Sequence, residues 1–430
     1  MISDLWTLRV LQLEPKLSLS QQAYSSQTPG FDTSEEDSET EGKVLKSLQG
    51  KKLESTPTLL DSLALCYLGC LTLRLPITLG DVHRWVTEGK MTYKRAIRHI
   101  PPAMKDRLPA QYHASLDPNA TLKLSRLHTA IVDLQVSFST EHGIVWPSLN
   151  VPLLLWRYLK DLALPLEVYD ATTRLAGILG YDFTLNTAGK TKMGVRHLPE
   201  AQLVACLVIS VKLFYPFTTS PSPETSSEPA ATAIDWNAWY LCISTARSNK
   251  EDGTPELTVE ELTNTKEKDV FGMTMRDMDQ YMDFYQDSFV DELRSENEAS
   301  EFRKALYNMF PIENLSKSSL VLNEREGPDR QEKRFEAVRA VQGTLTPARI
   351  VADGDDSRGT VRPGQGYAFW KKKEQLPEIS RRFYEEAAKI AGLELDTLVN
   401  AVFFAEKSIA KWSKREKKKK TAHEGEGMEE

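Results

Sequence analysis

The sequence predicts an all-α protein built mainly from two consecutive helical units. Several segments carry apolar residues near positions i, i+3, i+4 and i+7, which places them on one face of a helix. No segment shows the sustained alternation of apolar and polar residues that is typical of a half-buried strand. Capping signals and Pro or Gly stops divide the periodic segments, so many helices of ordinary length are expected.

The first unit is expected over residues 58–145 as five helices. Its opening segment is apolar on nearly every side, which is typical of a central bundle helix. Thr78 and Asp81 form a capping-box-like start for the next helix, which should place Trp85 in the core. The expected elements are helices at 59–75, 78–89, 91–100 and 121–139, with a short turn at 103–108.

The second unit is expected over residues 150–312. A Pro/Ser/Thr-rich insertion near 218–232 interrupts it and is expected to be a disordered surface loop. The expected helices lie at 151–162, 165–180, 199–215, 235–247 and 274–312. The core of this unit should include Leu155, Trp156, Leu207 and Val211, although Trp156 could instead face a partner.

The rest of the chain is more polar. Residues 1–57 should form a short helix and a disordered linker, because six carboxylates in the ten residues DTSEEDSETE leave too little apolar area to bury. A polar irregular segment is expected at 313–376, and a C-terminal helical extension at 377–413. Residues 414–430 form a basic and then acidic tail, which like-charge repulsion should keep disordered.

Composition excludes several classes of protein. The chain has 430 residues with 54 Lys+Arg against 61 Asp+Glu, so any nucleic-acid surface must be a local patch. Its four cysteines form no CxxC pair, and no zinc ribbon or other cofactor is expected in this chain. The longest apolar run, from Leu59 to Ile77, contains Asp61 and Arg74 and therefore predicts a buried helix, with no membrane partner.

Catalytic motifs are incomplete wherever they begin to form. The GKT at 189–191 lacks the first glycine of a phosphate loop, because Thr184 occupies that position. The DGDDSRG at 353–359 has Arg358 where a calcium loop needs glycine. The chain contains no HExxH or GxSxG sequence, so it is not expected to be an enzyme.

Charge is distributed unevenly along the chain. Residues 81–130 carry nine basic residues against four acids, whereas residues 251–300 carry fifteen acids against four basic residues. Five cations are therefore the candidate DNA-binding residues: Arg84, Lys90, Lys94, Arg95 and Arg98. The last three fall at helix-neighbour spacing and should point outward to phosphates, or else form an ordinary solvated face.

Long collinear strings carry a family resemblance. They include LALCYLGCLTLRLPITLGDVHRWVTEGKMTYKRAIRHIP, WPSLNVPLLLWRYLKDLALPLEVYDATTRLAGILGYDF and LPEAQLVACLVISVKLFYPF, followed by IDWNAW. Together they resemble the transcription factor IIB-like subunit of the fungal RNA polymerase I core factor, strongly over 59–250 and more weakly through LVNAVFFAEKSIAKW. The resemblance implies that each helical unit is a cyclin-like fold.

The resemblance also implies a function. It indicates an initiation factor that binds the ribosomal DNA core promoter with other core-factor subunits, recruits RNA polymerase I for pre-rRNA synthesis and meets TATA-binding protein. The family's N-terminal zinc ribbon is missing here, which either reflects an upstream exon absent from the gene model or removes ribbon-mediated docking. The alternatives are a cyclin-type regulatory subunit of a protein kinase and a scaffold without DNA contact, since one fold serves many functions.

The C-terminal basic run predicts a nuclear, and specifically nucleolar, location. Its candidate import residues are Lys414, Arg415, Lys417, Lys418, Lys419 and Lys420. A helix end that is solubilised by cations is the simpler interpretation, and the polymerase I resemblance favours import.

Overall fold

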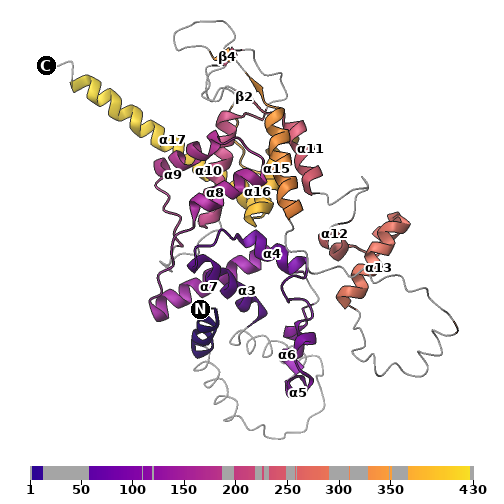
Figure 1. Cartoon of the computed structure of the whole chain (residues 1–430). Helices are drawn as coiled ribbons and strands as arrows, with labels where there is room; N and C mark the ends of the chain where they lie inside the picture. The colour runs from indigo at the N-terminus through magenta and orange to yellow at the C-terminus, as the bar shows by residue number, and fades with distance from the viewer. Residues whose placement is uncertain are drawn as a thin grey trace, which may run out of the picture.

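The computed structural model confirms the all-α prediction, with helices packed into two lobes (Figure 1). The structure describes residues 2–12, 58–108, 110–118, 121–185, 198–217, 225–226, 232–247, 257, 259–289, 309, 328–347, 349–350 and 367–426. The predicted acidic linker and most of the 218–232 insertion lie outside these ranges. The predicted boundaries of the two units remain predictions.

The first lobe is built around two helices that pack against each other. It contains α3 (Leu59–Thr72), α4 (Leu79–Thr87), η1 (Ala96–His99), α5 (Pro102–Lys105), α6 (Ala110–Leu116) and α7 (Leu124–His142). Leu68 of α3 and Leu127, Leu134 and Phe138 of α7 are almost completely buried. Burial of each such side chain contributes roughly 1.5–3 kcal/mol. Trp85 packs against this core but is only partly buried.

A short helix at residues 2–12 docks on this lobe, as the sequence predicts for the start of the chain. Leu5 is buried, and Arg9 lies 3.7 Å from the carboxylate of Asp61 on α3. Ser137 of α7 donates a hydrogen bond to Gln12 at 3.3 Å. The N-terminal helix is therefore tied to both central helices of the first lobe.

The second lobe surrounds one buried helix. It contains α8 (Val151–Asp161), α9 (Glu167–Leu179), α10 (Pro199–Phe214) and α11 (Trp236–Arg247). Leu155, Leu207 and Val211 are fully buried, as predicted. Trp156 is 50% exposed, so its prediction as a core residue is wrong. It follows Leu155 by one residue and therefore lies about 100° around the helix, away from the core.

The C-terminal helices complete the second lobe. They are α15 (Pro328–Gly343), η4 (Lys373–Gln375), α16 (Glu378–Ala391) and α17 (Leu395–Glu426). α16 and α17 pack against α10, and α15 packs against α11. Phe383 of α16 lies 5.4 Å between ring centroids from both Trp236 and Trp239 of α11, and 5.2 Å from Phe217. The predicted helical extension is thus part of a core assembled from distant sequence.

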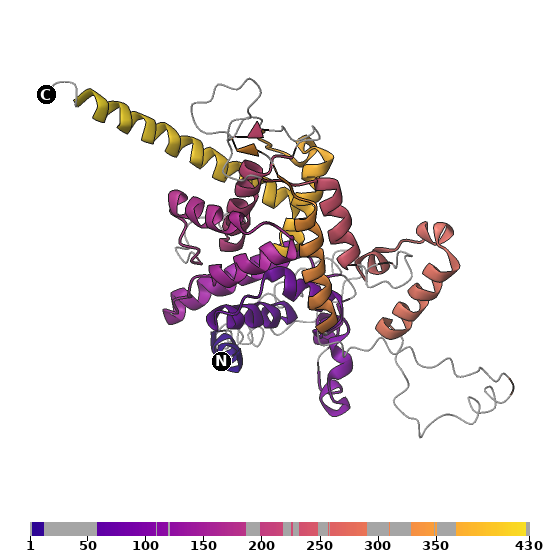
Figure 2. The same cartoon turned by 45° about the horizontal axis from the view of Figure 1, so that its top comes forward.

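Two predicted irregular regions are helical. The segment expected to be polar and irregular at 313–376 contains α15, whose Val341 is buried. The basic tail, expected to be disordered from residue 414, continues α17 to Glu426, and this helix projects from the body (Figure 2). In both cases a helical neighbour or a preceding helix supplies the order that local composition does not.

The remaining described elements are small. Strands β1 (Thr225–Ser226) and β4 (Arg349–Ile350) pair in parallel, and β2 (Thr232–Ala233) and β3 (Thr346–Pro347) pair antiparallel. Two helices and a 3₁₀ turn form an arm beside the first lobe (Figure 1). These are α12 (Val259–Asn264), η3 (Asp269–Gly272) and α13 (Met275–Phe289).

Candidate nucleic-acid interface and its ion-pair network

The five candidate DNA-binding residues lie on one short stretch of the first lobe. Arg84 is on α4, Lys90 follows its C-terminus, Lys94 and Arg95 precede η1, and Arg98 is within η1. The helix expected over 91–100 is reduced to this single 3₁₀ turn. Arg95 starts the turn in the left-handed backbone region, with φ of 50°, so helical spacing does not govern the last three cations.

Arg84 and Lys90 are held by acidic neighbours. The Arg84 guanidinium contacts Asp81 at 3.2 Å and Glu88 at 3.9 Å, and the Lys90 ammonium contacts Glu88 at 2.8 Å. Both basic side chains remain a little over one-third exposed. They can therefore reach a phosphate only by sharing or exchanging these carboxylate partners.

Lys94, Arg95 and Arg98 are half-buried, which differs from the predicted outward face. The Lys94 ammonium lies 5.6 Å from the centroid of the Phe284 ring on α13, within the range of a cation–π contact. Burial lowers the pKa of Lys94. The acidic arm therefore reaches the centre of the basic stretch.

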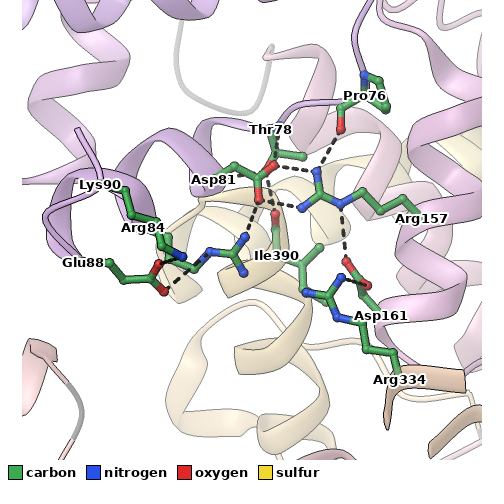
Figure 3. Close-up of polar contacts among 10 residues, drawn as sticks. All are labelled: Pro76, Thr78, Asp81, Arg84, Glu88, Lys90, Arg157, Asp161, Arg334 and Ile390. Carbon is green, nitrogen blue, oxygen red and sulfur yellow. Dashed lines mark hydrogen bonds and ion pairs between the residues drawn. The ribbon is translucent and has the colours of Figure 1, made fainter. Parts of the chain in front are cut away.

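Asp81 is the hub of a network that joins the two lobes (Figure 3). Arg157 of α8 donates two hydrogen bonds to its carboxylate, at 2.6 and 2.5 Å. The same carboxylate accepts the backbone N–H of Thr78 at 2.9 Å and caps α4. Burial would raise the pKa of Asp81, but the hydrogen bonds and charge of Arg157, the Thr78 N–H and the charge of Arg84 together lower it. Asp81 is accordingly a buried carboxylate whose charge is satisfied.

The network continues into the C-terminal helices. Arg157 also donates to the carbonyl of Pro76 at 2.8 Å and contacts Asp161 at 3.4 Å. Arg334 of α15 lies 3.7 Å from the other oxygen of Asp161 (Figure 3). Cations and carboxylates thus alternate from α4 through α8 to α15.

Backbone contact locks α4 against α16. A Cβ built on Gly80 would lie 2.7 Å from the backbone nitrogen of Gly392, which itself has φ of +69°. Thr78 donates its hydroxyl hydrogen to the carbonyl of Ile390 at 2.9 Å. Only glycine permits this approach, so the helix that carries Arg84 is fixed relative to the second lobe.

The candidate import residues lie on the projecting part of α17. Lys414, Arg415, Lys417 and Lys418 are exposed. Lys419 and Lys420 are helical, and their side chains lie outside the described set. The structure does not bring this run together with the Arg84–Arg98 stretch, so the chain presents two separate basic regions (Figure 2).

Metal and membrane features can be assessed only for the described ranges. Among those residues no three His, Cys, Asp or Glu side chains gather in a way that could hold a metal ion. None of the described helices is both long and apolar enough to cross a bilayer.

Sequence reasoning missed most of the network. The sequence identifies Asp81 only as a helix cap, and the i, i+4 spacing of Arg157 and Asp161 is the one local signal of an ion pair. No local pattern could join Arg157 to Asp81 or Arg334 to Asp161, because these partners are far apart in the chain.

Comparison with known proteins decides the family. The model of the Rrn7/TAF1B N-terminal cyclin domain matches residues 1–102, and that of the C-terminal cyclin domain matches residues 121–289. Together the two matches span more than half of the chain. The chain belongs to the Rrn7/TAF1B family.

Two relatives and one solved structure illustrate the breadth of the Rrn7/TAF1B family. The Schizosaccharomyces pombe "RNA polymerase I-specific transcription initiation factor rrn7" is 23% identical, over 95% of this chain and 78% of that protein. A human TATA box-binding protein-associated factor of RNA polymerase I is 29% identical, over 37% of this chain and 27% of that protein. The crystal structure of the S. cerevisiae core factor aligns with 95% of this chain and 96% of its own chain, at 13% identity and a TM-score of 0.48.

Proposed function

We propose that this protein is an RNA polymerase I-specific transcription initiation factor without enzymatic activity. It acts as a core-factor subunit that binds the ribosomal DNA core promoter and recruits RNA polymerase I for pre-rRNA synthesis. The observation that carries this proposal is the consecutive match to both Rrn7/TAF1B cyclin domains, joined to a relative of that stated function that aligns over nearly the whole chain.

The basic stretch supports a DNA-binding role for the first lobe. Arg84, Lys90, Lys94, Arg95 and Arg98 lie within fifteen residues and supply cations, which contribute affinity and register through phosphates rather than base sequence. Their carboxylate partners limit free charge, so DNA must displace or share Glu88 and its neighbours. The proposed partners are therefore the promoter, other core-factor subunits, RNA polymerase I and TATA-binding protein, in the nucleolus.

Co-purification tests this function against the kinase alternative. A tagged chain expressed at its natural level should recover RNA polymerase I subunits, and chromatin crosslinking should place it at the ribosomal DNA promoter. Depletion should reduce pre-rRNA synthesis before it affects messenger RNA. Recovery of a protein kinase without polymerase, or no enrichment at ribosomal DNA, would overturn the proposal.

A further inference from the structure

We propose that the projecting half of α17 is a second DNA-binding element, a rigid basic arm that lies against the phosphates of duplex DNA. This inference rests on the proposed function and assigns part of its DNA contact to a surface remote from the Arg84–Arg98 stretch. The arm leaves the body as a single helix beyond Ile409, the last of its residues packed against the core (Figures 1 and 2).

The cations of the arm gather on one face. At 100° per residue, they fall within about 100° of arc around the helix. The residues of this basic stripe are Lys407, Lys411, Lys414, Arg415 and Lys418, all exposed. Glu416, the one acid between 407 and 418, lies about 100° beyond the edge of the stripe. The stripe therefore presents charge of one sign.

The dimensions of the stripe suit a nucleic-acid duplex. Eleven residues separate Lys407 from Lys418, which corresponds to about 16 Å along the helix. A duplex carries one negative charge per roughly 1.7 Å of axis, so a segment of that length offers about ten phosphates. A bare helix about 10–12 Å across can also enter the major groove, which is about 12 Å wide.

The stripe continues into the body of the protein. A groove of about 350 Å³ lies where α17 meets α10 and the end of α9. Lys407 and Lys411 line it together with Tyr181 and Phe404. Phosphates held along the arm would thus be followed by a hollow that already contains two of the same cations.

The composition of the stripe favours a nucleic acid over an acidic protein surface. Protein–protein interfaces are depleted in Lys and centred on apolar or aromatic anchors. From Lys407 onward five cations and no apolar side chain make up the stripe, whereas exposed Trp412 points about 60° beyond its edge at Arg415. Phosphate, which needs charge rather than apolar contact, is the matching ligand.

The decisive variant replaces Lys407, Lys411, Lys414 and Arg415 with Gln. Gln has a helix propensity close to that of Lys and Arg, so the helix should persist. Binding of the full-length protein to a 30-base-pair duplex of unrelated sequence is measured by fluorescence anisotropy between 50 and 200 mM salt. The expected result is a loss of about tenfold or more in affinity, with a salt slope lower by roughly 3 to 4.

The matched control removes equal charge elsewhere. Lys266, Lys268, Lys371 and Lys372 are exposed, and their replacement with Gln should change affinity by less than twofold. A second variant, Ser413→Pro, keeps every charge but breaks the helix beyond its packed part. It should also weaken binding, because the stripe is presented only by an intact helix.

The outcomes separate the inference from the proposed function. Equal losses in the stripe variant and its control would overturn the inference, and so would unchanged affinity of the stripe variant. Wild-type affinity of Ser413→Pro would reduce the arm to a flexible polycation and overturn the claim of a rigid element. A stripe variant that binds DNA normally but leaves the nucleus would assign the stripe to import instead. Normal co-purification with polymerase in any of these cases would leave the proposed function standing.

Discussion

Replacing Arg157 with Met tests whether the ion-pair network holds the lobes together. The substitution keeps an apolar stem of similar length and removes the guanidinium that donates twice to Asp81. The Asp81 side chain is 5% exposed and that of Arg157 is 22% exposed, so the pair is largely desolvated. Breaking one side of a buried pair costs about 3–5 kcal/mol, and the remaining contact from Arg84 reduces the expected cost to about 2–3 kcal/mol.

Thermal unfolding gives the readout. For a domain of 150–250 residues each kcal/mol shifts Tm by about 2–4 °C, so the expected decrease is roughly 4–12 °C. Arg174→Met is the matched control, because the Arg174–Asp170 pair lies in the same lobe with 77% and 66% exposed side chains. Exposed pairs contribute about 0–1 kcal/mol. A loss for Arg157→Met no larger than that for Arg174→Met would refute the reasoning.

Acid titration provides a second, independent check on the same pair. The pKa of Asp81 is lowered in the folded protein, below the ordinary carboxyl value of 3.8. The stability that its charge contributes is therefore present above that value and lost as pH falls through the lower folded pKa. The difference in stability between the wild type and Asp81→Asn should accordingly be constant near neutrality and shrink below about pH 4.

Four further results are expected. Gly80→Ala should destabilise the protein by about 1–3 kcal/mol in denaturant unfolding, because its Cβ meets the Gly392 backbone, whereas Gly177→Ala, with nothing within 4 Å, should be neutral or stabilising. Alanine at Lys94, Arg95 and Arg98 together should weaken promoter binding across sequences and lower the salt slope by up to about 3; an unchanged slope would return these residues to a solvated role. Deleting residues 414–420 should shift a tagged protein toward the cytoplasm without lowering its Tm, and an unchanged nucleolar signal would mean that import depends on another segment. Burial raises the pKa of Glu200 to about 7, so the stability of the wild type should fall as pH rises from about 4.5 through 7, and Glu200→Gln should remove that dependence.

The helices of the two lobes were predictable because their signals are local. The all-round apolar run that ends in Leu207 and Val211 could only be a buried helix, and the Thr78–Asp81 capping box marked the start of α4 within a residue. Trp156 misled because an apolar string does not reveal which of two adjacent side chains faces the core. Its neighbour Leu155 is fully buried, while Trp156 is half exposed.

The missing parts depend on contacts between distant residues. The α15 sequence PDRQEKRFEAVRAVQG has few apolar side chains, and α15 is helical where it packs against α11 and α8. The stretch from Lys94 to Arg98 shows the reverse effect, since a helical charge pattern gave way to a 3₁₀ turn that buries Ala96 and Ile97. In both regions packing decided the local structure, which propensity alone leaves open.

The position of the basic stretch depends on the far end of the chain. α4 carries Arg84, and its first turn is held by the Ile390 carbonyl, by Gly392 and by Arg157, which come from α16, its C-terminal cap and α8. α16 in turn shares the aromatic cluster of Phe383 with α11. Any displacement of the C-terminal helices must therefore move α4 or break its cap. Because α17 follows α16 directly after Gly392, the two basic regions of the chain are connected to the same pair of packed helices, and their spacing is set by the fold rather than by a flexible linker.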